Sequence, residues 1–120
     1  MRAIIATVVV FAGIAACAAA PAVARLPPAD IQKTFFTGQP FTASTPSNIQ
    51  FKMVFMPDGK MTREPVGKAG VKDNGTWKLD KAGFCTTWKN SKPNCFVLVS
   101  TGENKWSVMK GPAVVAVWSK

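Results

Sequence analysis

The 120-residue sequence contains neither histidine nor tyrosine, and it has only three cysteines. Histidine is the side chain used most often in general acid–base catalysis, and it is also the commonest metal ligand. Its absence removes the usual catalytic base and the nitrogen ligands of most zinc sites. We therefore expect a protein that is not an enzyme and that holds neither a metal nor another cofactor.

Only Cys85 and Cys95 lie outside the N-terminal leader described below, and they do not form the Cys-x-x-Cys pattern of redox-active pairs. Two thiols without a histidine are half of a zinc site. In an exported chain, two remaining cysteines indicate a disulfide bond. Closing a loop of about ten residues in this way is expected to stabilise the fold by roughly 2.5–3 kcal/mol.

Acidic residues are also few, with 6 Asp+Glu against 15 Lys+Arg and a formal charge of +9. Asp58, Asp73 and Asp80 each lie in a turn-forming string, where aspartate bonds to nearby backbone. A paired-carboxylate active site is therefore not predicted. The excess of cations favours an anionic lipid, a polysaccharide or an acidic protein as partner, although the lysines come singly rather than in a run.

The first 24 residues have the pattern of an export signal. An early arginine precedes an uncharged apolar run, and Ala22-Val23-Ala24 is a small-x-small cleavage site. We expect a signal peptide over residues 1–24 and a single periplasmic or secreted domain over residues 25–120. A second interpretation stays open, because Ile14-Ala15-Ala16-Cys17 resembles the bacterial lipobox, which would give a lipoprotein anchored through Cys17.

Short β-prone segments separated by turn signals fill the rest of the chain. Ile49–Met56 alternates, and Pro57-Asp58-Gly59-Lys60 predicts a hairpin after it. One helical turn is expected at Ala29–Thr34 and an irregular loop at Pro65–Asn74. Further strands are expected at Phe41–Ser44, Lys60–Glu64, Thr76–Leu79, Phe84–Trp88, Cys95–Ser100, Lys105–Lys110 and Ala113–Ser119. The pattern predicts an all-β domain, as a small antiparallel barrel without exposed edges or, alternatively, a two-sheet sandwich.

Tryptophan and lysine are neighbours three times, which is one way to build a stacking platform for single-stranded nucleic acid. Adjacent side chains of a strand point to opposite faces, however, so the ring and the ammonium cannot share one face. We therefore expect no nucleic-acid partner. The expected core aromatics are Trp77, Trp88, Trp106, Phe51 and Phe55, and the candidate surface-binding residues are Lys78, Lys89 and Lys105.

The turn Pro57-Asp58-Gly59, the strand start Gly75-Thr76-Trp77 and the set Cys85, Trp88 and Cys95 form a recurring combination. With the leader, it resembles a broad set of small exported alphaproteobacterial proteins with no assigned function. The resemblance covers the larger part of the chain after the leader. It implies the all-β fold, the disulfide and export, and it supplies no catalytic residue.

The interior of the barrel bears directly on function. An eight-stranded barrel of short strands can be filled by its own side chains, and we expect a filled interior. The sequence then favours a non-enzymatic periplasmic domain that binds an anionic envelope component or a partner protein through its basic surface. The alternative is a carrier of a small apolar ligand inside a lipocalin-like barrel, with a pocket at one mouth.

Overall fold

The computed structural model describes residues 24–120. The predicted export signal, apart from Ala24, and Cys17 lie outside these residues. Apart from one short strand at residues 24–25, the strands and the helix follow the predicted segments to within a few residues. They are β1 (Ala24–Arg25), α1 (Pro28–Phe35), β2 (Pro40–Ser44), β3 (Gln50–Phe55), β4 (Lys60–Pro65), β5 (Asp73–Leu79), β6 (Phe84–Trp88), β7 (Asn94–Gly102), β8 (Lys105–Lys110) and β9 (Ala113–Ser119).

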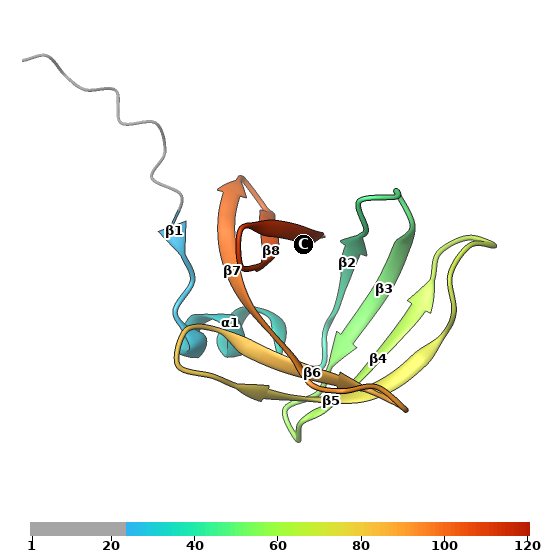
Figure 1. Ribbon diagram of the computed structural model, residues 1–120, viewed down its shortest axis with the longest axis horizontal. Helices are drawn as coiled ribbons and strands as arrows, with labels where there is room; N and C mark the ends of the chain where they lie inside the picture. Colours follow the sequence, from blue (N-terminus) through green and yellow to red (C-terminus); the bar gives the residue numbers. More distant parts are fainter. Residues whose placement is uncertain (1–23) are drawn as a thin grey trace, which may run out of the picture.

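Strands β2 to β9 form an up-and-down meander that closes on itself (Figure 1). Each strand pairs antiparallel with the next, and β9 returns to β2 with Trp118 opposite Ala43. The short strand β1 adds to the edge of β7, where Arg25 pairs with Val99. The predicted antiparallel barrel is therefore confirmed and the sandwich is excluded, while β1 was not predicted.

Alternation along the strands decides which side chains enter the barrel. On β3, Phe51, Met53 and Phe55 are buried at 7%, 6% and 0% exposure, while Lys52 between them is exposed. On β4, Met61 is buried at the position opposite Phe55. Period-two alternation of this kind is what an antiparallel strand with one buried face requires.

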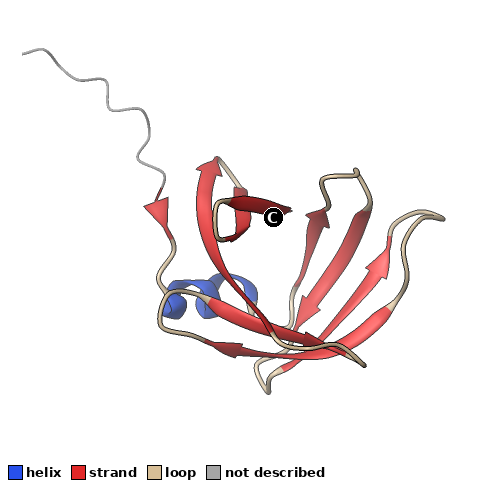
Figure 2. Ribbon diagram, viewed as in Figure 1, coloured by secondary structure: helices blue, strands red, loops and turns tan. Residues whose placement is uncertain are grey.

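Helix α1 covers one end of the barrel, as Figure 2 shows. Its sequence favours this start, because Pro28 suits the first helical position and Asp30 lies in the first turn near the positive helix end. The helix is longer than the single turn that the sequence predicts, and its residues Ile31 and Phe35 are buried. Among residues 24–120, no helix has the length and hydrophobicity needed to cross a membrane.

Two consecutive phenylalanines at the end of α1 fill the barrel beneath the helix. The ring of Phe35 lies among aromatic rings of β2, β8 and β9, with centroid distances of 5.0 Å to Phe41, 4.9 Å to Trp106 and 5.1 Å to Trp118. The ring of Phe36 lies among those of β3, β5 and β6, at 4.8 Å from Phe55, 4.3 Å from Trp77 and 5.7 Å from Phe84. We call Phe35 and Phe36 the plug.

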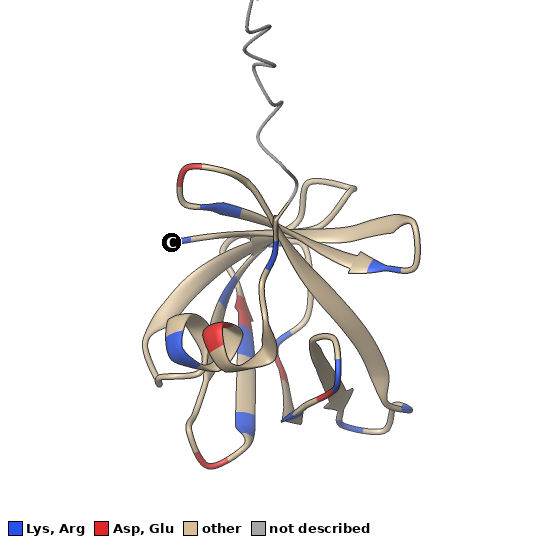
Figure 3. Ribbon diagram, turned by 90° about the vertical axis from the view of Figure 1, so that its left-hand side faces the viewer, with Lys and Arg blue, Asp and Glu red and all other residues tan. Residues whose placement is uncertain are grey.

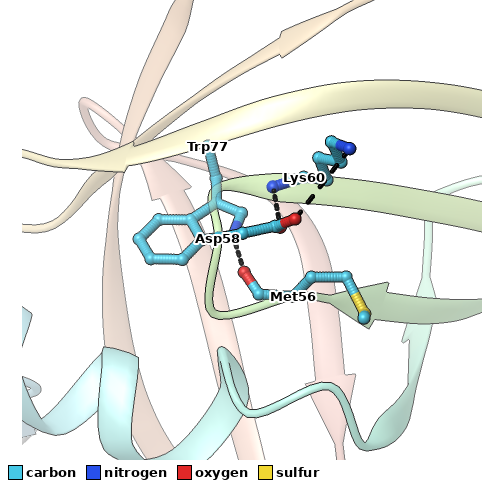
Figure 4. A network of polar contacts seen from close by, with 4 residues as sticks. All are labelled: Met56, Asp58, Lys60 and Trp77. Atoms are coloured by element: carbon cyan, nitrogen blue, oxygen red, sulfur yellow. Dashed lines mark hydrogen bonds and ion pairs between the residues drawn. The ribbon is translucent and has the colours of Figure 1, made fainter.

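Trp77 fixes the β3–β4 hairpin to β5 (Figure 4). Its indole Nε1 donates a hydrogen bond of 2.8 Å to the Met56 carbonyl oxygen, and its backbone N–H donates one of 2.8 Å to the Gly59 carbonyl oxygen. The turn itself is held by Asp58, whose Oδ1 accepts from the Lys60 backbone N–H at 3.1 Å. Gly59 has φ +96°, which favours glycine. The predicted hairpin is confirmed.

The disulfide joins β6 to β7 at positions that lie directly opposite each other. Cys85 pairs with Cys95 in the strand register, and their Cα atoms are 3.9 Å apart. Cys85 is buried and Cys95 is exposed. The predicted bridge is therefore confirmed, and it ties together the two strands that follow the first Trp-Lys pair.

The burial of the plug predicts a large loss of stability when one of its rings is removed, and a matched control variant is available. Phe36→Ala removes a ring that is 1% exposed, and we expect it to lower the free energy of unfolding by about 3–5 kcal/mol. Phe96→Ala removes the same group from a half-buried position on β7 and should cost clearly less. Urea unfolding of both variants and the wild type measures the difference. Equal losses in the two variants would contradict the role given to the plug.

Candidate functional site: a cavity at the open end of the barrel

The barrel is filled at the α1 end and hollow at the other. The hollow part is a cavity of about 360 Å³ that opens between the loops opposite α1. Side chains from seven strands and one loop line it: Ala43, Thr45, Phe51, Met53, Phe55, Arg63, Phe84, Thr86, Trp88, Asn94, Phe96, Val108, Lys110, Val115, Ala116 and Trp118. The expectation of a filled interior is therefore right for one half of the barrel and wrong for the other.

The physical reason lies in the size of the inward side chains. At the α1 end, Phe35 and Phe36 add their rings to those of the strands. At the opposite end no segment of residues 24–120 enters in this way, and several inward positions carry small side chains, among them Ala43, Thr86 and Ala116. The strand side chains alone are too small to close this half, and the cavity remains.

Three aromatic rings form the floor of the cavity and separate it from the plug. Phe55 and Phe84 are 0% exposed and Trp118 is 4% exposed. The centroid of Trp118 lies 5.6 Å from that of Phe55 and 5.1 Å from that of Phe84. These three residues, which we call the floor, give the deep part of the cavity an apolar surface with no ionisable group.

Arg63 enters the cavity from β4 and is held on several sides. Its guanidinium carbon lies 4.6 Å from the ring centroid of Trp88 and 5.1 Å from that of Phe51. Its Nε donates a hydrogen bond of 3.2 Å to the Val71 carbonyl oxygen. Its Nη2 forms an ion pair of 3.8 Å with Asp73, its neighbour on β5. A guanidinium has five N–H donors, so these contacts orient Arg63 and still leave donors for a ligand.

A second cation stands on the opposite wall. Lys110 ends β8, which is four strands away from β4 around the eight-stranded barrel. Its Nζ donates a hydrogen bond of 2.6 Å to Oδ1 of Asn94, the first residue of β7. Lys110 is exposed, whereas the Arg63 side chain is only 28% exposed. The cavity thus has an apolar floor and a cation on each of two facing walls.

The predicted core aromatics divide between the plug and the cavity. Phe55, Trp77 and Trp106 contact the plug, and Phe51 and Trp88 line the cavity beside Arg63. Trp118, which is the most central tryptophan, was not among the expected core residues. Its strand, Ala113–Ser119, is apolar on both faces, so no alternation of polar and apolar residues indicates which side points inward.

The three candidate surface lysines are exposed but do not form one surface. Lys78 lies on the outside of β5, Lys89 follows β6 at the cavity end, and Lys105 begins β8 at the α1 end. Figure 3 shows the basic residues spread over several strands and loops. Sequence reasoning missed Arg63, although alternation along β4 from the buried Met61 places it on the inward face.

One further group of potential ligands lies outside the barrel. A carboxylate oxygen of Asp80 and the sulfurs of Cys85 and Cys95 lie within 4.8 Å of one another. Both sulfurs belong to the disulfide, so the group offers no thiolate to a metal ion. Metal chemistry therefore has no support at this place.

The chain matches no protein-family model, no curated protein and no solved structure. The arrangement of the site is thus the basis for any statement about function.

The contacts of Arg63 predict that its side chain contributes modestly to the stability of the fold. We expect Arg63→Met to lower the free energy of unfolding by about 1–2 kcal/mol, because it removes two cation–π contacts and a partly exposed ion pair. Lys60→Met removes an exposed cation from the same strand, and its effect should stay within about 0.5 kcal/mol. Thermal and urea unfolding measure both changes. A loss above about 4 kcal/mol for Arg63→Met would show that this side chain is a main support of the fold.

Proposed function

We propose that this protein is a non-enzymatic binding protein that holds a small amphipathic molecule in the barrel, with an apolar body and an anionic head group. The observation that carries the proposal is the cavity of about 360 Å³ at the end of the barrel opposite α1. Sites for small molecules typically measure about 300–1,000 Å³, so this volume favours a small ligand. The proposal corresponds to the carrier that the sequence left as its alternative.

The apolar body of the ligand is supported by the apolar lining of the cavity. Phe55, Phe84 and Trp118 close the cavity at its bottom and are almost fully buried, while the half-buried side chains of Trp88, Phe96 and Val115 keep accessible apolar surface above them. Filling such a space transfers apolar surface out of water at both partners, which is favourable in proportion to the area removed. A polar ligand would find few partners at this depth.

The anionic head group is supported by the two cations on the walls. Arg63 is fixed by its contacts before any ligand arrives, so little side-chain entropy is lost when it binds an anion. Its fork of N–H groups matches a carboxylate or a phosphate. The ion pair with Asp73 is long, at 3.8 Å, and partly exposed, which leaves the guanidinium available to a ligand.

Two further observations favour binding over catalysis and over a general basic surface. Among the described residues that line the cavity there is no carboxylate, thiol or imidazole that could act as an acid, a base or a nucleophile. The three lysines expected to bind an anionic partner lie at different parts of the barrel. The disulfide indicates an oxidising, non-cytoplasmic compartment, and we propose that the protein works in the periplasm or after secretion.

Binding of decanoate tests the proposal, with 1-decanol and decyltrimethylammonium as comparison ligands that differ only in the head group. Isothermal titration calorimetry should show one site per protein, with decanoate bound most tightly and the cation least. Arg63→Met and Lys110→Met should each weaken decanoate about tenfold or more, since a hydrogen bond to a charged group contributes about 1.5–3 kcal/mol. Decanol should be almost unaffected by either change.

A pair of alanine variants separates the cavity from the outer surface. Ala116→Phe adds a ring inside the cavity and should abolish decanoate binding, whereas Ala29→Phe adds the same ring to the exposed face of α1 and should leave it unchanged. Melting curves of both variants check that the fold persists. Equal binding by the wild type and a folded Ala116→Phe variant would contradict a ligand in the barrel.

A further inference from the structure

The loops around the open end of the barrel expose more large apolar side chains than the loops at the α1 end. In an up-and-down barrel alternate loops share one end, so the loops at residues 45–49, 66–72, 89–93 and 111–112 surround the cavity mouth. We call the residues of these four loops the rim. Val66 and Val71 in the rim are 62% and 70% exposed, and Val114 just beyond it is 45% exposed. At the α1 end, Met56 is 40% exposed.

Charge is also distributed unevenly between the two ends. Four of the six acidic residues lie in α1 or in the turns at the α1 end, namely Asp30, Asp58, Asp80 and Glu103. The other two, Glu64 and Asp73, lie near the rim, and both are in ion pairs, of 3.4 Å with Lys72 and 3.8 Å with Arg63. Within the described part of the chain, Lys68, Lys89 and Lys92 of the rim form no ion pair, and the rim is therefore positively charged.

The loop at residues 66–72 (VGKAGVK) combines both properties and is fixed to the barrel. The Val66 N–H donates a hydrogen bond of 3.0 Å to the Gln50 carbonyl oxygen, and the Val71 carbonyl oxygen accepts the bond from Arg63. Gly70 has φ +99° and lies so close to the Phe51 ring that a Cβ atom would come within 2.9 Å of it. These contacts hold the loop in place with its two valines in solvent.

We propose that the rim docks on the surface of an anionic lipid bilayer. Val66 and Val71 would enter the interfacial layer, and Lys68, Lys89 and Lys92 would lie near the lipid phosphates. A combination of exposed apolar side chains and lysines at one surface is typical of proteins that bind such interfaces. Of the lysines that the sequence marked as candidates, only Lys89 belongs to this surface.

The shape of the rim favours a bilayer over an acidic protein. The rim consists of separate loops around an opening, so a rigid protein surface would contact mainly the loop tips, whereas stable protein interfaces bury a large continuous area. A lipid surface is deformable and contacts several loop tips at once. Docking in this orientation places the cavity mouth against the lipids, although the proposal itself does not depend on a ligand in the cavity.

Vesicle binding with matched lysine variants tests the proposal. Purified protein is sedimented with phosphatidylcholine vesicles that contain or lack phosphatidylglycerol, at low and high salt. We expect binding only to the anionic vesicles and a steep loss with salt. The triple change Lys68→Gln, Lys89→Gln and Lys92→Gln should weaken binding by about fivefold for each lysine removed. Any contribution from residues 1–23 is common to all variants.

The matched control removes three exposed lysines from the α1 end. Lys33→Gln, Lys81→Gln and Lys105→Gln change the net charge equally and should weaken binding far less. Equal losses in the two triple variants would show general electrostatic adsorption and would overturn the proposal. Tight binding of soluble polyglutamate without binding to anionic vesicles would overturn it in favour of an acidic protein.

Insertion of the rim has a spectroscopic test of its own. Val71→Trp places an added tryptophan in the rim, and Met56→Trp places one at the α1 end. On anionic vesicles, emission of the Val71→Trp variant should shift to the blue and be quenched by brominated lipid beyond the wild-type signal, and that of Met56→Trp should not. Decanoate binding by the rim triple variant should equal that of the wild type, so failure of docking and failure of the cavity proposal are distinguishable.

Discussion

Phe35 and Phe36 enter the barrel from one end and occupy the space that the strand side chains leave there. Because they follow one another in the sequence at the end of α1, their rings diverge and contact different walls, one towards Trp106 and Trp118 and the other towards Phe55 and Trp77. These contacts hold helix α1 in place over one end of the barrel. Lys120 adds to them, since its Nζ lies 5.8 Å from the Phe35 ring centroid and donates to the Thr34 carbonyl oxygen.

The plug also determines what the opposite end can do. Eight strands enclose an interior that side chains can fill, but only if enough large residues point inward at every level. Here the large rings are concentrated at the level of α1, and above the floor the cavity is bordered by small residues such as Ala43 and Thr86. The cations Arg63 and Lys110 stand where the cavity meets water, so that their charge stays hydrated. The two ends of the barrel therefore differ. One end is closed and aromatic, and the other is open and cationic.

Much of this fold is predictable from the sequence because its signals are local. Alternation identified β3, the Asp58-Gly59 turn identified the hairpin, and the count of cysteines identified the disulfide. The plug was not predictable in this way, because nothing near Phe35 and Phe36 in the sequence shows that the rings they meet come from six different strands. Closure of the sheet, and not any local pattern, brings those rings together.

The candidate site was harder to predict than the fold for the same reason. Arg63 lies in a strand with a readable alternation, yet its two ring partners come from β3 and β6, which meet it only in the folded sheet. For Trp118, the apolar strand β9 carries no period, and a register shift between Val108 and Met109 in the β8–β9 pairing further obscures its inward side. The rim could not be predicted from the sequence, because its lysines come from loops far apart in the chain.

The most direct test of the central claim is to locate a bound ligand by nuclear magnetic resonance. With decanoate bound, the terminal methyl group should give intermolecular nuclear Overhauser effects to ring protons of the floor residues Phe55, Phe84 and Trp118. Shifts of the Arg63 guanidinium resonances should accompany them, while the backbone of α1 should show little change. Overhauser effects confined to the outer surface, or none with decanoate in excess, would contradict a half-filled barrel that holds its ligand above the plug.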